Sequence, residues 1–455
     1  MFHLATELAS REEPVRVGVI GAGLFGTNLV EQLERTPGIE PSGIADIEVE
    51  KAIQTFTRAG VPRAIIDRVD DAVRATDAMT GERRVVLADG RTLATTGVDV
   101  IVEATGNPVA AAHHAFDAIM AGTHVVMATV EADTVVGPIL AQLARTNGVT
   151  YAMAYGDQPA LIVELHDWAR AIGLDVIVAG KGNPAPASWQ YGTPEDVFDR
   201  IGMTDTFVAE RGLNPRMYNS FFDGTKVAVE MGAVGNALGF VPDVPRMHLP
   251  TADIPTIPQQ LRPRADGGIL DRAGVVETVR TVTPDGKSLD QDIGFGVFIV
   301  TSTQSERTQR YFSQYSDSGM ITASDGRYQL FWRPFHLPGV ETGISVAHAA
   351  LHNAATGSPR EHATEVVAAA KRELIAGDEI DGGGGYTVYG TLVSVDTATA
   401  NGYVPLALLD GAIVERTVER DDIITDEHVR LDEDSFLYTL RTLQSQTIDG
   451  GGSAG

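Results

Sequence analysis

Apolar positions in the first third of the chain fall into short runs separated by segments of helical period. The runs cover residues 15–20, 98–104 and 124–127, and a further run ends at Asp46. Runs of this length that alternate with amphipathic helices predict parallel strands with helices on both faces of one sheet. The pattern therefore predicts an α/β fold with a doubly wound parallel sheet over residues 1–155.

The pattern loosens after this point. Helical periods and strand-like runs follow without regular alternation, at residues 159–172, 175–179, 226–238 and 294–301, with a proline-rich stretch at 242–263. Irregular succession of this kind favours an α+β domain, which we place at residues 156–380. Its last element is predicted to be an alanine-rich helix over about 341–375 that packs back on the first sheet.

Four consecutive glycines at residues 382–385 predict a hinge or a turn. Alternating apolar residues follow them, which is typical of strands, so we predict a small β-rich domain over residues 381–447. The glycine-rich end, residues 448–455, is predicted to be a flexible tail.

Charge restricts the classes of partner. The 455 residues carry a formal charge of −26, with 61 acidic against 35 basic side chains. Such an excess disfavours nucleic acids and anionic membranes. No uncharged apolar run approaches the ~20 residues of a membrane helix, and the first residues lack a signal-peptide pattern. We expect a cytoplasmic protein that acts on a small molecule.

Metal and thiol chemistry has little support in the sequence. Cysteine is absent, which excludes a cysteine nucleophile and a zinc–thiolate site. The 11 histidines lack the H-E-x-x-H spacing or any other tight metal-binding spacing. Asp223 and Glu230 offer a divalent cation two carboxylates, too few to support a site. We therefore predict no metal site.

The turn after the first apolar run has the spacing G-x-G-x-x-G. Gly21, Gly23 and Gly26 form it, with Leu24 and Phe25 between the last two glycines. Because the motif follows a strand and opens a helix, the three glycines are expected to permit a tight turn, close approach of a pyrophosphate, and close helix packing, respectively. The motif predicts a nicotinamide dinucleotide bound at the helix N-terminus through residues 21–26.

An acid, Asp46, ends the next strand 20 residues after Gly26. At this place a carboxylate accepts a hydrogen bond from the ribose 2′-hydroxyl, which favours NAD over NADP. Lys51 lies close enough in the sequence to bind a 2′-phosphate instead, so NADP remains an alternative.

Two later strand ends are predicted to contact the cofactor. One supplies Thr105, Gly106 and Asn107, and the other is followed by Glu131. Ligands of doubly wound sheets bind outside the carboxyl ends of the strands. For Glu131 the alternative is a carboxylate that only stabilises the start of a helix.

The predicted helix at 226–238 carries the candidate catalytic residues. If the helix begins at Thr225, Lys226 and Glu230 lie on one face and Asp223 caps the start. An ammonium group beside a carboxylate suits proton donation or polarisation of a carbonyl in hydride chemistry. The alternative is a surface ion pair, which contributes little.

Two further lysines are assigned from their predicted surroundings. Lys181 stands in the glycine-rich segment 180–183, where we predict a loop that meets an anionic substrate group; a solvated loop lysine is the alternative. Lys371 falls on the predicted alanine-rich helix and is expected to be exposed.

With these residues in place, the chain resembles the homoserine-dehydrogenase-like oxidoreductases that carry a C-terminal SAF-type domain. Among them it is most similar to the 1-deoxy-D-xylulose 5-phosphate reductoisomerase-like (DXR-like) group. The resemblance extends over almost the whole chain, through the segments RVGVIGAG (16–23), RTPGI (35–39), GIAD (43–46), GDQP (156–159), GKG (180–182), DGTK (223–226), RPFHL (333–337) and GGYTVYG (384–390).

The resemblance implies an NAD(P)-binding Rossmann domain, a catalytic and dimerisation domain, a SAF-like β domain and a homodimer. It also implies that Lys226 polarises the reacting carbonyl or hydroxyl. The expected function is hydride transfer to or from a small hydroxylated or phosphorylated carbonyl substrate. Homoserine dehydrogenase activity proper and a non-catalytic dinucleotide sensor are the alternatives. No arginine cluster for a phosphate is evident, and Asp46 favours NAD, so both features weaken the sugar-phosphate interpretation.

Overall fold

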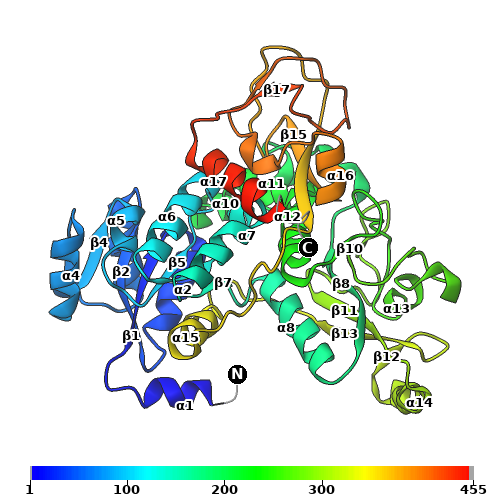
Figure 1. The fold of residues 1–455 in the computed structure, drawn as a ribbon, viewed down its shortest axis with the longest axis horizontal. Coiled ribbons are helices and arrows are strands. Elements are labelled where there is room, and N and C mark those ends of the chain that lie inside the picture. Colours follow the sequence, from blue (N-terminus) through cyan, green and yellow to red (C-terminus); the bar gives the residue numbers. More distant parts are fainter. Residues whose placement is uncertain (1–2, 450–455) are drawn as a thin grey trace. The chain divides into compact units, whose positions relative to one another are not determined.

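The protein is described by a computed structural model over residues 3–449, which form two compact units. In its described part, unit 1 comprises residues 3–161, 337–360 and 434–449, and unit 2 comprises residues 162–336 and 361–433. Both units are therefore assembled from segments far apart in the sequence, as the colours of Figure 1 show.

Unit 1 is built on a seven-stranded sheet of order β3-β4-β2-β1-β5-β6-β7, in which every adjacent pair is parallel. The sheet confirms the predicted doubly wound α/β fold. It also contains β3, β4 and β7, which the apolar pattern did not reveal. The strands are β1 (Val15–Ile20), β2 (Ile39–Ala45), β3 (Ile66–Arg68), β4 (Arg84–Leu87), β5 (Val100–Glu103), β6 (His124–Met127) and β7 (Tyr151–Met153).

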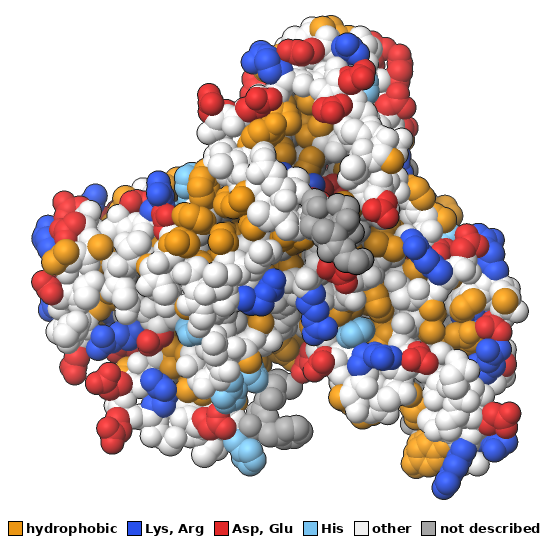
Figure 2. Space-filling model, viewed as in Figure 1, with side chains coloured by type: hydrophobic (Ala, Val, Ile, Leu, Met, Phe, Trp, Pro, Cys, Tyr) orange, Lys and Arg blue, Asp and Glu red, His pale blue; other side chains and the backbone are white. Residues whose placement is uncertain are grey.

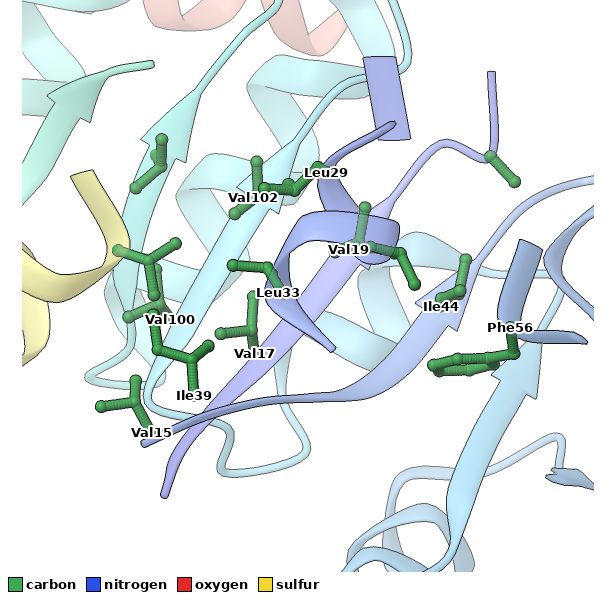
Figure 3. Packing of buried hydrophobic residues seen from close by; sticks show 14 of the residues in the cluster. Val15, Val17, Val19, Leu29, Leu33, Ile39, Ile44, Phe56, Val100 and Val102 are labelled. Carbon is green, nitrogen blue, oxygen red and sulfur yellow. The ribbon is translucent and has the colours of Figure 1, made fainter. Parts of the chain in front are cut away.

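Helices cover both faces of this sheet. One face carries α2 (Leu24–Leu33), α3 (Val49–Arg58) and α15 (Gly343–His352), and the other carries α5 (Gly90–Ala94), α6 (Pro108–Met120) and α7 (Val130–Thr146). Figure 3 shows the core on the first face, where Val17, Val19 and Val102 of the strands meet Leu29 and Leu33 of α2. Strands buried on both faces explain the nearly continuous apolar runs of the sequence. Helices α1 (Leu4–Ala9) and α4 (Ala72–Thr80) complete the first segment.

The helix predicted over about 341–375 is wrong beyond residue 352. Helix α15 ends at His352 and packs on β1, β5, β6 and β7, so only this part lies on the first sheet. The chain then passes Gly357 and Pro359 and forms a strand, β14 (Thr364–Ala370), in unit 2. Pairing of β14 with β15 (Val388–Ser394) overrides the helical propensity of its alanines.

The C-terminal helix α17 (Phe436–Gln444) belongs to unit 1, where it packs on α6 and α7. Pro138 lacks an N–H and interrupts the hydrogen bonds of α7. The buried Gln444 amide bridges this interruption: its Oε1 accepts from the Ile139 N–H at 3.1 Å, and its Nε2 donates to the Val135 carbonyl at 3.2 Å. The prediction of β structure up to residue 447 was therefore wrong.

The predicted flexible tail, residues 448–455, begins within a described element. A π-helix covers Ser445–Asp449, so residues 448 and 449 are helical. The rest of that prediction, residues 450–455, lies outside the described residues.

Unit 2 contains a six-stranded mixed sheet of order β12-β13-β11-β8-β10-β9. Strands β8, β10 and β9 are parallel, whereas β11 is antiparallel to β8 and β13. The sheet strands are β8 (Asp175–Asn183), β9 (Val241–Pro242), β10 (Val275–Arg280), β11 (Val297–Ser302), β12 (Ile321–Thr322) and β13 (Tyr328–Arg333).

The helices of this part of the chain are mostly short. The helix predicted at 226–238 is confirmed as α12, which packs on β8, β10, β14 and β15. The elements are α8 (Gln158–Ala171), which leads into unit 2, α9 (Val197–Arg200), α10 (Asp205–Arg211), α11 (Pro215–Phe222), α12 (Thr225–Leu238), α13 (Ile257–Gln260), α14 (Glu306–Gln314) and α16 (Val395–Ala400).

The glycine run at 382–385 is part of the connection between paired strands β14 and β15, inside unit 2. It is therefore no hinge between independent domains, which corrects the prediction. Asp381 fixes the connection by accepting from the Tyr386 and Thr387 N–H groups at 2.6 and 3.0 Å. A second small antiparallel pair is formed by β16 (Ile413–Val414) and β17 (Val429–Arg430).

Acidic side chains are interspersed with Lys and Arg over the visible face, as Figure 2 shows. In the described part of the chain, no helix has the length and apolar character needed to cross a membrane.

Candidate functional site

The glycine-rich loop between β1 and α2 is shaped by two glycines that admit no side chain. Gly21 has a φ of +104°, and a Cβ atom there would lie 2.6 Å from the Ala104 carbonyl oxygen. A Cβ atom on Gly26 would lie 2.0 Å from the Gly21 carbonyl oxygen. Both positions therefore need glycine for the turn and for the close packing of α2 on β1.

Gly23 differs, because a Cβ atom there would meet nothing within 4 Å. Gly23 is the N-cap residue of α2, and no side chain caps this helix. Open space before uncapped N–H groups fits a pyrophosphate, which would accept hydrogen bonds from the backbone. Of the neighbouring residues, Leu24 is exposed, whereas Phe25 packs against the core.

Asp46 follows β2 and reaches the same loop. Its Oδ2 accepts from the Ala22 N–H at 2.7 Å, and its Oδ1 accepts from the Glu48 N–H at 2.8 Å. Lys51 forms an ion pair with Glu48, whose hydrogen bond raises the pKa of Lys51. The acid expected to bind a ribose hydroxyl thus also fixes the loop.

The carboxyl end of β5 holds a buried hydrogen-bond network around Glu103 that was not predicted from the sequence. Glu103 is completely buried, and its carboxylate accepts hydrogen bonds from the Thr105 and Thr129 hydroxyls. Thr129 Oγ1 in turn accepts from the Gly106 N–H at 2.9 Å, and His114 Nδ1 lies 3.3 Å from Glu103 Oε1. The signal for this network is an acid at the end of an apolar run, because a glutamate is rarely buried without partners.

The other predicted cofactor contacts lie around this network. Thr105, Gly106 and Asn107 are exposed, and a Cβ atom on Gly106 would meet nothing within 4 Å. The Asn107 side chain caps α6 by accepting from the Ala110 N–H at 2.9 Å. Glu131 is half-buried in the first turn of α7. A carboxylate there can contact the cofactor or only stabilise the start of the helix.

Helix α12 is buried on all sides along most of its length. Between Thr225 and Ala237, every residue is buried except Lys226, which is half-buried. Lys226 is therefore the position at which this stretch of the helix is accessible.

Glu230 lies one turn further along α12 and forms an ion pair with Lys181. Both side chains are almost completely buried, with 4% of each exposed. Lys181 is a residue of β8, paired with both β10 and β11, so the prediction of a flexible loop at 180–183 was wrong. The segment is a strand because it pairs with β10 and β11, and its glycines permit close packing: a Cβ atom on Gly180 would lie 2.4 Å from the Glu277 carbonyl oxygen.

Asp223 takes part in a second buried ion pair. Its Oδ2 accepts from Lys371 Nζ at 2.8 Å, and its Oδ1 accepts from the Thr225 N–H at the start of α12. Lys371 Nζ also donates to the carbonyls of Gly192 and Gly385 at 2.7 and 2.6 Å, so all three of its donors are used. Lys371 is thus neither helical nor exposed. Burial raises the pKa of Asp223.

The structure therefore groups the candidate catalytic residues differently from the sequence. Lys226, Glu230 and Lys181 belong to one region of α12 and β8, whereas Asp223 pairs with Lys371 beside the β14–β15 connection. Each carboxylate has a lysine partner from a distant segment. No group of three or more metal-binding side chains occurs among the described residues.

Two family profiles match the chain. Residues 21–154 match the NAD-binding domain of homoserine dehydrogenase, and residues 156–342 match the catalytic domain of oxidoreductase DRL. Residues 21–342 are therefore similar to an NAD-binding domain followed by an oxidoreductase catalytic domain. The first match contains the loop at Gly23, and the second contains Lys181, Lys226 and Glu230.

Solved structures resemble this oxidoreductase only distantly. The 1-deoxy-D-xylulose 5-phosphate reductoisomerase from Zymomonas mobilis in complex with NADPH is 16% identical, with a TM-score of 0.34, over 49% of this chain and 58% of that chain. GenD2 from gentamicin A biosynthesis in complex with NAD is 14% identical, with a TM-score of 0.35, over 74% and 87% of the two chains. A search of curated proteins found no significant match.

Proposed function

We propose that the oxidoreductase transfers a hydride between NAD(P) and a small hydroxylated or phosphorylated carbonyl substrate. Gly23 and the uncapped start of α2 would hold the pyrophosphate, and Asp46 would hold the adenine-side ribose. Thr105 and Gly106, in the loop after β5, would contact the nicotinamide side of the cofactor. Asn107 and Glu131 complete the proposed contacts. When bound, the nicotinamide donates or accepts the hydride.

Lys226 is proposed as the group that acts on the substrate oxygen. Hydride transfer to a carbonyl carbon builds negative charge on the oxygen, and a nearby ammonium stabilises that charge or donates the proton. The observation that carries this assignment is the accessibility of Lys226 on a helix whose neighbouring residues are buried.

The Lys181–Glu230 pair is proposed as a positioning pair. It ties α12 to β8 one turn from Lys226, and so fixes the helix face that presents the ammonium group.

The predictions of a homodimer, a SAF-like domain and a cytoplasmic location rest on resemblance and composition and stay proposals. Sedimentation of the purified full chain tests the first of these. The mass of two chains is expected, and the mass of one chain at micromolar concentration would contradict it.

The activity is tested by following NADH and NADPH oxidation in the presence of small aldehydes, keto acids and sugar phosphates, and reduction of NAD and NADP with the corresponding alcohols. We expect turnover with at least one compound, and its loss in Lys226→Met. If both cofactors bind but no compound turns over, the sensor alternative gains support and hydride transfer loses it.

Homoserine dehydrogenase activity proper and 1-deoxy-D-xylulose 5-phosphate reduction are the two specific alternatives within this class. The same assay with homoserine and with 1-deoxy-D-xylulose 5-phosphate separates them.

A further inference from the structure

Arg280 is a half-buried cation without an acidic partner in the described part of the chain. It is the last residue of β10, and one guanidinium N–H group donates to the Ala185 carbonyl at 3.2 Å. Burial lowers the pKa of Arg280. With 61 acidic residues in the chain, an unpaired, half-buried arginine is unexpected, because an isolated charge is costly to bury.

The register of the sheet places Arg280 beside the proposed catalytic region. In the parallel pairing of β8 with β10, Lys181 is opposite Thr278 and Asn183 is opposite Arg280. Residues in register, and residues two apart on one strand, point to the same face of a sheet. These four side chains therefore share one face, in a patch of about 5 by 7 Å by ordinary strand spacing.

Two polar side chains of this patch lack hydrogen-bond partners. Thr278 is completely buried and Asn183 is 5% exposed, and neither Thr278 Oγ1 nor Asn183 Oδ1 forms a hydrogen bond with any described residue. Buried polar atoms are normally satisfied by protein, water or ligand. The Thr278 hydroxyl and the guanidinium beside it are donors, which indicates a bound group with oxygen atoms, whereas Asn183 Oδ1 is an acceptor and needs a donor such as a hydroxyl of the same molecule.

The negative charge of that group follows from the two cations of the patch. Lys181 already has Glu230, so its charge is balanced within the protein. Arg280 has a carbonyl partner only, and its planar guanidinium matches the oxygens of a phosphate or a carboxylate.

We propose that Arg280 and Thr278 form a subsite for an anionic group of the substrate, a phosphate or a carboxylate, with Asn183 Oδ1 placed to accept from a hydroxyl of the same substrate. The inference rests on the proposed hydride transfer and specifies the substrate class of the same site. It moves the anion-binding role, which the sequence assigned to Lys181, to a residue that the sequence analysis did not single out.

The subsite is tested by thermal unfolding of the full chain in inorganic phosphate and in acetate, each compared with sodium chloride of equal ionic strength. For the wild-type protein we expect phosphate or acetate to raise Tm by roughly 2–4 °C beyond chloride. The anion that gives the larger rise identifies the group. Arg280→Met should lose this rise.

The variants separate binding from folding. Without phosphate or acetate, Arg280→Met should be at least as stable as wild type, because methionine removes a half-buried charge and keeps much of the side-chain volume. Arg264→Met is the matched control, since Arg264 is exposed in unit 2 and paired with Asp271 at 2.6 Å; it should keep the full rise.

Three results would overturn the subsite: no rise beyond chloride with either anion, an equal rise in Arg280→Met, or a lower Tm of Arg280→Met in chloride alone. The last would mean that Arg280 only caps the Ala185 carbonyl. None of these readings uses NAD(P)H turnover. If the wild-type protein turns over a substrate but gains no stability from either anion, only the subsite is contradicted. If the wild-type protein binds the anion but turns over no compound, only the proposed hydride transfer is contradicted.

Discussion

The Ala22 N–H donates to Asp46 Oδ2 at 2.7 Å, so the acid at the end of β2 also fixes the glycine-rich loop after β1. A carboxylate oxygen has two lone pairs, which leaves Asp46 able to accept a further bond from a ribose hydroxyl. Asp46 therefore has two separable effects on the cofactor: the shape of the loop and the recognition of the ribose.

Two substitutions at Asp46 separate these effects. Asp46→Ala should weaken the binding of both cofactors by loosening the loop. The binding of NAD should weaken by a further 10- to 100-fold or so, since a charge-assisted hydrogen bond contributes about 1.5–3 kcal/mol. Asp46→Asn keeps an oxygen for the Ala22 N–H, so this variant should lose affinity mainly for NAD. Titration calorimetry measures both constants. Equal losses for NAD and NADP in Asp46→Asn would mean that Asp46 does not contact the ribose.

The glycines of the loop provide a matched pair of variants. Gly23→Ala should fold with an unchanged free energy of unfolding, because its Cβ meets nothing within 4 Å, but should bind NAD(P) at least ~10-fold more weakly by filling the space for the pyrophosphate. Gly26→Ala should be destabilised, because its Cβ would lie 2.0 Å from the Gly21 carbonyl oxygen. Urea unfolding and cofactor titration check the pair. Wild-type NAD(P) affinity in Gly23→Ala would contradict the proposed pyrophosphate site at Gly23.

The parts of the protein that the sequence predicted are those with local signals. The run before Gly21, the glycine spacing and the helical period at 226–238 each lie within a short segment, and each appears in the structure as expected. The parallel sheet follows from the alternation of apolar runs and helical segments in residues 1–155.

The errors concern residues whose surroundings come from distant segments. Lys181 meets Glu230 from 49 residues away, and Lys371 meets Asp223 from 148 residues away. Neither pairing leaves a trace in local periodicity. The alanines of β14 have helical propensity, and only their pairing with β15 makes them a strand. Gly357 and Pro359 were a local signal that the helix ends before residue 364, and it was overlooked.

Lys371 should be essential for stability although it lies outside the proposed catalytic region. Lys371→Met leaves the Asp223 carboxylate buried without a cation, which should cost about 3–5 kcal/mol of unfolding free energy. Lys287→Met is the control: its exposed pair with Asp285 should contribute less than about 1 kcal/mol. Chemical denaturation checks both. A wild-type midpoint for Lys371→Met would contradict the buried pair.

Unit 1 contains a carboxyl group that should make stability depend on pH. Asp133 of α7 is buried, and burial raises its pKa to about 7. The Tyr151 hydroxyl donates to its Oδ1 at 2.9 Å, and its Oδ2 has no partner among the described residues.

Because the pKa of Asp133 is higher in the folded than in the unfolded chain, the folded state retains the proton between about pH 4 and pH 7. Its contribution to stability is present at the acid end and is lost as the pH rises through this window, by up to about 1.4 kcal/mol per pH unit. Asp133→Asn removes this dependence, so its stability relative to wild type should increase between about pH 4 and pH 7. A constant difference between the two proteins would contradict the raised pKa.

The most direct test of the account is the turnover of Lys226→Met with the substrate found by the NAD(P)H assay. Methionine keeps most of the apolar stem of lysine but has neither charge nor donor. We predict that kcat falls at least about 100-fold, the lower range for a general acid or a charge-stabilising donor, while NAD(P) affinity stays nearly unchanged. Lys287→Met, on the exposed segment, should retain normal turnover. Near-normal kcat in Lys226→Met would contradict the catalytic assignment.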